Sequence, residues 1–305
     1  MNRDGGTDIP MKILDFGSLN IDHVYHLKHL VREGETLSSD TYRKNAGGKG
    51  LNQAIALARA GCRVYFAGAV GKDGLFLKEY LESFGVDTTR LKTLDEPTGH
   101  AIIQVDEEGR NSIILYGGAN RKITDEMIDQ ALDGFEPGDY ILLQNEISGL
   151  SGIMKKAAQK GLRIALNPSP ISPALLNAPL DVVNCFLLNE VEGADLTGEN
   201  EPDKILDALL SRYPACRAVL TLGEKGSIYA DKNTRARQDA VRVRAVDTTA
   251  AGDTFTGYFL SSMLLGEPVA RSLYTAAVAS AIAVSRPGAG ASIPARAEVL
   301  SAMVK

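Results

Sequence analysis

The sequence predicts an α/β protein in three layers, with helices on both faces of a central, mostly parallel sheet and a small separate β-sheet as a lid. Short β-rich runs alternate with helix-like stretches along most of the 305 residues. Two further β-rich segments interrupt this alternation. The composition, with 44% hydrophobic and 23% charged residues, is that of an ordinary soluble globular chain with a large core.

The main alternation begins with a buried strand at 12–16, which ends at a turn formed by Gly17 and Ser18. Apolar periodicity predicts strands at 64–69, 140–144, 163–166 and 186–188, and helices at 49–60, 75–84, 124–132, 149–160, 254–264 and 276–285. The sequence Arg-Pro-Gly-Ala-Gly at 286–290 ends the last helix. We expect one domain over 11–305, preceded by a disordered leader at 1–10.

The two interrupting segments predict the lid. One runs from 23 to 39 with a turn at Gly34, and the other is a hairpin of strands 98–105 and 111–116. Insertions at about 20–45 and 97–118 would then form a lid that keeps water away from a reaction. Ile102, Ile113 and Leu115 indicate an apolar lid face, which predicts a homodimer through the lid.

Charge and composition exclude several classes of function. The net charge is -5 and no stripe of Lys and Arg is present, which argues against nucleic acid as a partner. No apolar stretch is long enough to span a membrane and the N-terminal residues are not typical of a signal peptide, so we expect a cytoplasmic protein. The three cysteines lack the spacing of a zinc site.

The segment Asp247-Thr-Thr-Ala-Ala-Gly-Asp-Thr-Phe255 carries the sharpest chemical signal. Small residues at 250–252 lead into a helix, whose first N–H groups and positive dipole end can bind phosphate. Asp253 lies at this helix start, where a carboxylate can accept a proton from a substrate hydroxyl. The alternative is that Asp253 is only the N-cap of the helix.

Two earlier clusters offer groups for a polar ligand. In Gly47-Gly-Lys-Gly-Leu-Asn-Gln-Ala54 the glycines allow close approach of the backbone, and Lys49 and Asn52 can donate to hydroxyls. The chain has no Walker A motif. Asn20 and Asp22, two apart in an extended segment, point to the same side. A helix-start turn and a polar loop, both without ligand, are the alternatives.

Two later clusters contain groups that can bind a nucleotide together with its metal ion. Asn189 and Glu192 follow a strand and share a face if a helix starts there, and their oxygens suit magnesium. The alternative is acidity favoured by the dipole of a helix start. The loop from Thr221 to Gly226 also follows a strand and is typical of the edge of a nucleotide site.

Together and in this order, these motifs resemble those of the PfkB-type carbohydrate kinase family, and within it the ribokinases. The match rests on Gly-Ser-Leu-Asn-Ile-Asp-His at 17–23, on the Gly-Gly-Lys-Gly segment at 47–54, on Asn-x-x-Glu at 189–192 and on the segment 247–255. It covers nearly the whole chain from Met11. Ala46 and Ala277 depart from the ribokinase pattern, which commonly has an aromatic and a larger polar residue there. The resemblance implies the ribokinase-like fold.

The resemblance also implies roles for individual residues. Sugar hydroxyls would be bound by Asn20, Asp22, Gly48, Lys49, Asn52 and Glu146, together with Asp253 as the general base. Ala250, Ala251 and Gly252 would form the anion hole. ATP would be bound by Asn189, Thr221, Gly223, Gly226 and Gly252, with the adenine beside 276–283. Mg²⁺ would lie at Asn189 and Glu192. Potassium, as an activating monovalent cation, would lie at Asp247, Thr249, Val284 and Ser292.

The implied reaction is transfer of the γ-phosphoryl group of ATP to the 5-hydroxyl of D-ribose. The alternatives are a related kinase acting on 2-deoxyribose, a ketohexose or a nucleoside. A catalytically silent sugar-binding protein is a further alternative, although it would be expected to lack Asp253 or Gly252.

Overall fold

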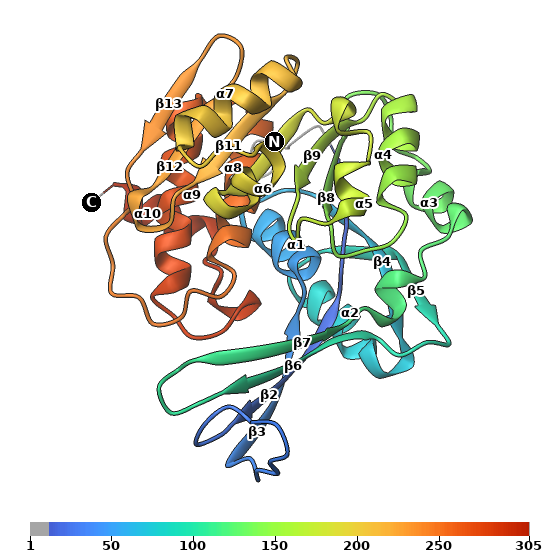
Figure 1. Ribbon diagram of the computed structural model, residues 1–305. Coiled ribbons are helices and arrows are strands. Elements are labelled where there is room, and N and C mark those ends of the chain that lie inside the picture. Colours follow the sequence, from blue (N-terminus) through green and yellow to red (C-terminus); the bar gives the residue numbers. More distant parts are fainter. Residues whose placement is uncertain (1–11, 305) are drawn as a thin grey trace.

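A nine-stranded central sheet, in which most of the strands are short apolar runs, forms the middle of the structure, a computed structural model that describes residues 12–304 (Figure 1). The strand order is β13-β12-β11-β10-β9-β8-β1-β4-β5. Neighbouring strands from β5 to β11 pair in parallel, and β12 and β13 complete the sheet as antiparallel strands. The strands are β1 (Ile13–Phe16), β4 (Val64–Gly71), β5 (Asp87–Leu94), β8 (Tyr140–Gln144), β9 (Arg163–Asn167), β10 (Cys185–Asn189), β11 (Arg217–Thr221), β12 (Ser227–Ala230) and β13 (Arg235–Gln238).

Helices cover both faces of this sheet, because successive side chains of a strand point to opposite faces. Ile13 belongs to one buried cluster and Leu14 to another. The first cluster includes side chains of α1 (Lys49–Arg59), α2 (Leu75–Ser83), α8 (Ala251–Leu264), α9 (Val269–Val284) and α10 (Arg296–Met303). The second includes side chains of α3 (Asp125–Leu132), α4 (Leu150–Gln159), α5 (Pro173–Leu176), α6 (Glu190–Thr197) and α7 (Pro202–Arg212). The predicted three-layer fold is therefore confirmed.

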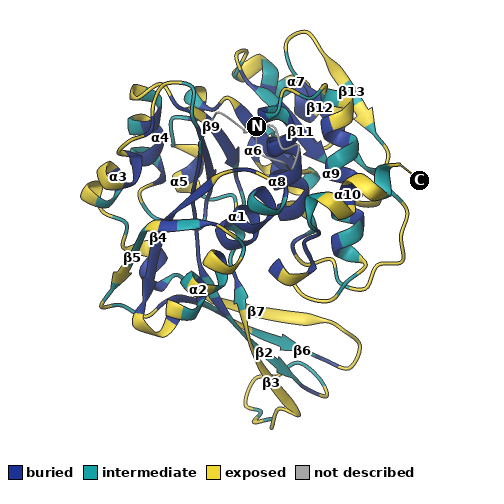
Figure 2. Ribbon diagram, turned by 180° about the vertical axis from the view of Figure 1, so that it is seen from behind, coloured by how far each residue is buried: buried dark blue, intermediate teal, exposed yellow. Residues whose placement is uncertain are grey.

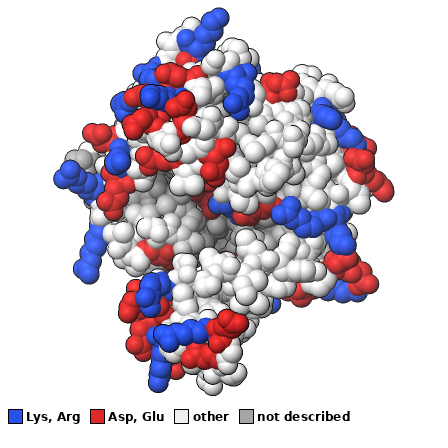
Figure 3. Space-filling model, viewed as in Figure 1, with Lys and Arg blue, Asp and Glu red and all other residues white. Residues whose placement is uncertain are grey.

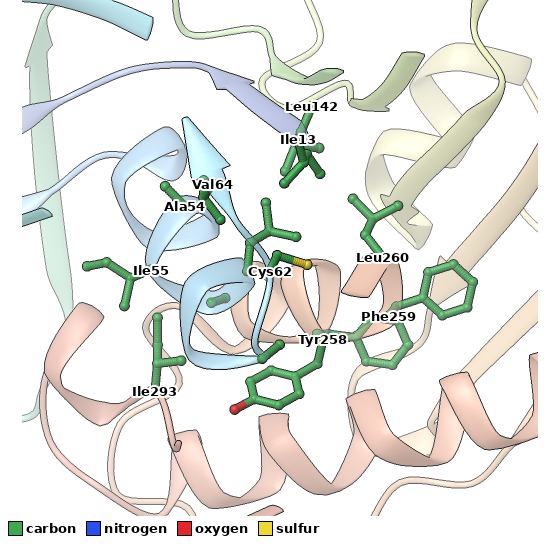
Figure 4. Close-up of a cluster of buried hydrophobic side chains, with 14 of the residues drawn as sticks. Ile13, Ala54, Ile55, Cys62, Val64, Leu142, Tyr258, Phe259, Leu260 and Ile293 are labelled. Atoms are coloured by element: carbon green, nitrogen blue, oxygen red, sulfur yellow. The ribbon is translucent and has the colours of Figure 1, made fainter. Parts of the chain in front are cut away.

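Helices α1 and α8 approach each other closely inside the first cluster. Figure 4 shows Ala54 of α1 in the same cluster as Tyr258 and Phe259 of α8. Gly257 permits the approach, because a Cβ atom at this position would lie only 2.4 Å from the Cβ atom of Ala56. The contact holds the N-terminal ends of both helices beside each other.

A second, four-stranded sheet stands away from the central sheet (Figure 1). Its order is β3-β2-β6-β7, in which β2 pairs in parallel with β6 and the other pairs are antiparallel. The strands are β2 (Asn20–His26), β3 (Thr41–Gly47), β6 (Gly99–Val105) and β7 (Asn111–Tyr116). Figure 2 shows that much of this sheet is exposed or only half-buried. We call it the lid sheet.

The first predicted lid segment is partly wrong. The strands lie at 20–26 and 41–47 rather than within 23–39, although Gly34 does lie in a turn. The strand β3 is mostly exposed and polar, so it has no alternating apolar pattern and is held by backbone pairing with β2. The second segment, the hairpin, is confirmed.

The apolar residues of the lid sheet lie on two faces rather than one. Ile102 pairs with Ile114, whereas Ile113 pairs with Ile103. Directly paired residues point to the same side, and neighbours along a strand point to opposite sides. Ile113 and Leu115 therefore share a face, and Ile102 lies on the other face.

The remaining predictions differ mainly in length. Helix α8 begins at Ala251 rather than at 254, because the small residues before Asp253 are already part of its first turn. Helix α9 begins at Val269, seven residues earlier than predicted. The predicted leader lies outside the described residues. Within 12–304, no helix is long and apolar enough to cross a membrane.

Candidate active site

The predicted site residues come together at the carboxyl ends of the parallel strands. This is the edge where open α/β sheets bind ligands. The strands β1, β8, β10 and β11 end there, and the helices α1 and α8 begin there. Figure 3 shows a hollow between the central sheet with its helices and the lid sheet.

Asp253 lies in the first turn of α8 and is 9% exposed. Its carboxylate accepts hydrogen bonds from two α1 side chains, Asn52 Nδ2 at 3.1 Å and Gln53 Nε2 at 2.9 Å. The N-cap residue is Ala250, so the alternative that Asp253 caps the helix is wrong. The close packing of α1 against α8 thus presents a fixed carboxylate to the cavity beside it.

The N-terminus of α8 has the form expected of an anion site. Ala250 has a φ of 60°, which lies in the left-handed region, and no side chain caps the helix. Ala251 donates its N–H to the carbonyl of Thr248 at 3.2 Å. A Cβ atom at Gly252 would meet no other atom within 4 Å, so this position opens into space. These residues line a cavity of about 250 Å³ together with Lys49 and Asp253.

The carboxylates of Asp22 and Glu146 interact on the lid side of the site. Burial, together with the charge of Glu146, raises the pKa of Asp22 to about 6. Gly47 makes room for this carboxylate, because a Cβ atom there would lie 2.1 Å from Asp22 Oδ2. Asn20 accepts a hydrogen bond from Asn120 Nδ2 at 2.9 Å. Asn20 and Asp22 alternate along β2 and share one side, as predicted.

Glu146 and Lys49 connect this side of the site to α1. Glu146 Oε2 accepts the backbone N–H of Lys49 at 3.1 Å and the hydroxyl of Ser18. Gly48 has a φ of 102°, and a Cβ atom there would lie 2.8 Å from the carbonyl oxygen of Ser18. Although burial lowers the pKa of Lys49, the charges of Asp253, Glu146 and Glu192 raise it above its ordinary value. Lys49 is therefore a permanent cation among carboxylates.

Asn189 and Glu192 form a capping box at the start of α6. Asn189 Oδ1 accepts the backbone N–H of Glu192 at 2.9 Å, and Glu192 Oε2 accepts that of Asn189 at 3.0 Å. The alternative interpretation as a helix start is therefore correct for their local role. Both side chains also line the cavity at Asp253, so the two interpretations are compatible.

A second cavity, of about 700 Å³, adjoins the first. Thr221, Thr248 and Gly252 line both cavities. Gly223 and Gly226 line the second cavity beside β11, and Ala277 and Ala281 of α9 form part of its apolar wall. The predicted nucleotide residues are therefore brought together, with the anion site of α8 between the two cavities.

The four residues predicted for a monovalent cation are only partly available. Asp247 accepts the N–H of Thr249 at Oδ1 and that of Gly288 at Oδ2, each at 2.9 Å. The carbonyl of Val284 already accepts two N–H groups, from Val246 and Asp247. Ser292 donates its hydroxyl to the carbonyl of Ala289 at 2.7 Å.

Sequence reasoning missed several side chains that support the site. They are Ser18, Gln53, Asn120, Gln144, Asn167 and Thr248. Gln53 directly follows Asn52 in the Gly-Gly-Lys-Gly segment at 47–54, so its place in this motif could have indicated a role in the site. Asn120 comes from a 3₁₀ turn at 118–121, with no local pattern that links it to Asn20.

Comparisons with known proteins agree with this geometry. The family described as pfkB family carbohydrate kinase matches residues 11–296. A ribokinase of Haemophilus influenzae is 35% identical over 293 residues, covering 93% of this chain and 95% of that protein. The structure of ribokinase from Cryptococcus neoformans in complex with ADP has a TM-score of 0.85 and 36% identity, covering 96% and 99% of the two chains. Arabidopsis thaliana ribokinase, complexed with ribose and ATP, has a TM-score of 0.84 and 32% identity, covering 95% and 98%.

Proposed function

We propose that this chain, which belongs to the pfkB family of carbohydrate kinases, transfers the γ-phosphoryl group of ATP to the 5-hydroxyl of D-ribose. One observation carries the proposal. The fixed carboxylate of Asp253 lies in the first turn of α8, whose N-terminus has no side-chain cap, and it lines a polar cavity that adjoins a larger and more apolar one. The similarity to ribokinases over nearly the whole chain supports ribose as the sugar.

In the proposed reaction Asp253 accepts the proton of the 5-hydroxyl. The hydroxyl oxygen forms a bond to the γ-phosphorus while the bond to the bridging oxygen breaks, and ADP leaves. The N–H groups of Ala250 and Gly252 and the ammonium of Lys49 stabilise the charge on the transferred group, whereas the N–H of Ala251 already donates to the carbonyl of Thr248. Asn20, Asp22, Asn52 and Glu146 hold the sugar hydroxyls, while Thr221, Gly223 and Gly226 hold the nucleotide. The protein thus supplies position and charge neutralisation.

Magnesium is part of the proposal, and the residues present fit it. Within 12–304 there is no cluster of three or more His, Cys, Asp or Glu that could hold a metal. Mg²⁺ usually keeps several waters and binds through one or two carboxylates and phosphate oxygens, so Glu192 with the phosphates is a sufficient donor set. When bound, the ion would neutralise phosphate charge. Asn189 would hold Glu192 in place through the capping box.

Potassium fits less well. Val284 cannot serve as a ligand without losing one of the two N–H groups that its carbonyl accepts. We therefore propose Asp247, Thr249 and Ser292 as the residues nearest to an activating cation, and we exclude Val284. Potassium stimulation that persists in Asp247→Asn would contradict this site.

The lid sheet completes the proposal. We propose that it covers the bound sugar as part of a single 11–305 domain, and that Ile113 and Leu115, which are 51% and 65% exposed, pair with a second copy. A monomer in light scattering at micromolar concentration would refute the dimer. Because ATP is abundant in the cytoplasm, we assign the reaction to that compartment.

The experiment is an ADP-release assay with MgATP and four acceptors, namely ribose, 2-deoxyribose, fructose and adenosine. We expect ribose to have the highest kcat/KM, chelation of Mg²⁺ to abolish turnover, and potassium to raise it. A different preferred acceptor would retain the kinase and refute ribose as the substrate. ADP release that is equal with and without every acceptor would refute the sugar kinase.

A further inference from the structure

A buried chain of side-chain hydrogen bonds lies behind Asp253, on the side away from the cavity. Gln53 Nε2 donates to Asp253 Oδ1 at 2.9 Å, and Gln53 Oε1 accepts from Gln144 Nε2 at 2.7 Å. Gln144 Nε2 also donates to Asp15 Oδ1 at 3.0 Å. Asp15, Gln53 and Gln144 come from β1, α1 and β8 and are 0%, 1% and 0% exposed.

Two oxygen atoms at the far end of this chain have no hydrogen-bond partner among the described residues. They are Asp15 Oδ2 and Gln144 Oε1. An unpaired buried polar atom is costly, and a buried carboxylate that accepts only one bond is more so. Both atoms belong to side chains already joined by the bond from Gln144 Nε2 to Asp15 Oδ1. A proton on Asp15 Oδ2 would turn an unpaired acceptor into a donor, and Gln144 Oε1 is an unpaired acceptor on the side chain that Asp15 already contacts.

The surroundings of Asp15 oppose a charge there. On the neighbouring strands it pairs with Phe66 of β4 and Leu142 of β8, both fully buried. Burial raises the pKa of Asp15 well above its ordinary value despite the bond from Gln144, and the charge of Asp253 raises it further. The two carboxylates of Asp15 and Asp253 therefore repel each other when both are charged.

We propose that Asp15 is a neutral carboxylic acid that fixes the direction of the chain through Gln144 and Gln53, and is thereby a positioning residue for Asp253. Its proton lies on Oδ2 and is donated to Gln144 Oε1. The amide of Gln144 then turns Nε2 toward Gln53, and the amide of Gln53 turns Nε2 toward Asp253. The role as a positioning residue rests on the proposed function, whereas the protonation of Asp15 does not.

The direction of the chain matters because an amide has a donor end and an acceptor end. If Gln144 turned over, its oxygen would face Gln53 Oε1, and Gln53 would have to turn its own oxygen toward Asp253. The carboxylate would then lose a charge-assisted hydrogen bond and face an oxygen. An acid proton at Asp15 prevents this reversal without placing a second negative charge near the base.

The protonation is tested directly by infrared spectroscopy of the protein without substrates. The difference spectrum between wild type and Asp15→Asn at neutral pH should show the carbonyl stretch of a protonated acid, which shifts in D₂O. A difference spectrum that shows only a carboxylate would overturn the proposal. The result of this measurement does not depend on whether the protein phosphorylates ribose.

The positioning role is tested by two variants. In Asp15→Asn the new amide can donate to Gln144 Oε1 and accept from Gln144 Nε2, so kcat should stay within about threefold of wild type. In Asp15→Leu the side chain of Gln144 loses its hydrogen-bond partner at position 15, so neither Gln144 nor Gln53 is held in one orientation. The kcat should therefore fall by about tenfold or more. The acidic limb of the kcat/KM profile should then move up by about one pH unit, while the KM for ATP changes little.

Ile13→Val is the matched control, since Ile13 is fully buried on the same strand and face. It should lower stability without moving the pH profile. Asp15→Leu should also be non-additive with Gln53→Met, because both variants break one chain. The positioning role would be overturned if Asp15→Leu folds and keeps the wild-type kcat and pH profile. Equal losses of kcat in Asp15→Asn and Asp15→Leu would overturn it as well. If wild type lacks activity, only the proposed function fails.

Discussion

Replacing Asp22 with asparagine should make the folded protein more stable at neutral pH. The folded-state pKa of Asp22 is about 6, against an ordinary value of 3.8, so the folded state holds its proton more tightly than the unfolded state does. Stability is therefore lost as pH rises from about 4 to above 6. At 1.36 kcal/mol per pKa unit, the full loss is about 3 kcal/mol, of which between about 2 and 3 kcal/mol falls between pH 4 and 7.

The assay is urea denaturation of wild type and Asp22→Asn at several pH values in this range. The difference in unfolding free energy should grow in favour of Asp22→Asn as the pH rises, and level off above about pH 6.5. Asp40→Asn, an exposed acid of the lid-sheet loop, is the control and should show no such trend. A difference between Asp22→Asn and wild type that is the same at pH 4 and 7 would refute the reasoning.

Three further outcomes are expected. Ribose should bind more tightly as pH rises through about 6, because ionised Asp22 would be the better acceptor for the sugar hydroxyls that we propose it holds. Calorimetry showing equal affinity at pH 5 and 7 would contradict this. Gly252→Ala places a methyl group in the space where we propose the transferred phosphoryl group lies, without contacting other protein atoms. The kcat should therefore fall at least tenfold, while the free energy of unfolding changes by less than about 1 kcal/mol. Gly257→Ala forces a Cβ atom against Ala56, so it should destabilise by roughly 1–3 kcal/mol in the same denaturation assay. The control for both is Gly152→Ala in α4, which meets only ordinary contacts and should alter neither activity nor stability greatly. A Gly252→Ala variant with the kcat of this control, or a Gly257→Ala variant with its stability, would count against the reasoning for that position.

Local pattern was sufficient for much of the fold. Most of the buried strands and the helices α1, α2, α3, α4 and α8 were predicted within a few residues, because burial of one face leaves a clear period in the sequence. Helices α5, α7 and α10 and strands β5, β12 and β13 were not predicted, and α6 was considered only as a possible helix start at 189. Strand β5 is mixed in burial and α6 is only weakly amphipathic, whereas α7 buries residues at helical spacing and carried a usable pattern. The faces of the lid sheet were misjudged because strand alternation alone does not fix the register between β6 and β7.

The candidate site shows the same division between local and long-range information. Asp253 and Gly252 were predicted because the segment at 247–255 carries its own pattern. The chain from Asp15 through Gln144 to Gln53 was not, since hydrogen bonds join positions 91 and 129 residues apart in the sequence. In the sequence, Asp15 was only one residue of a buried strand, and its charge gave no sign of its partners.

The central claim is that Asp253 removes the proton from the sugar hydroxyl, and the most direct measurement is kcat for Asp253→Asn with ribose and MgATP. A positioned general base contributes about 10²–10⁴-fold, so we expect a loss of that size. Calorimetry should show that ribose still binds within about tenfold of the wild-type affinity. A variant that keeps kcat within tenfold of wild type would contradict the assignment of Asp253 as the base.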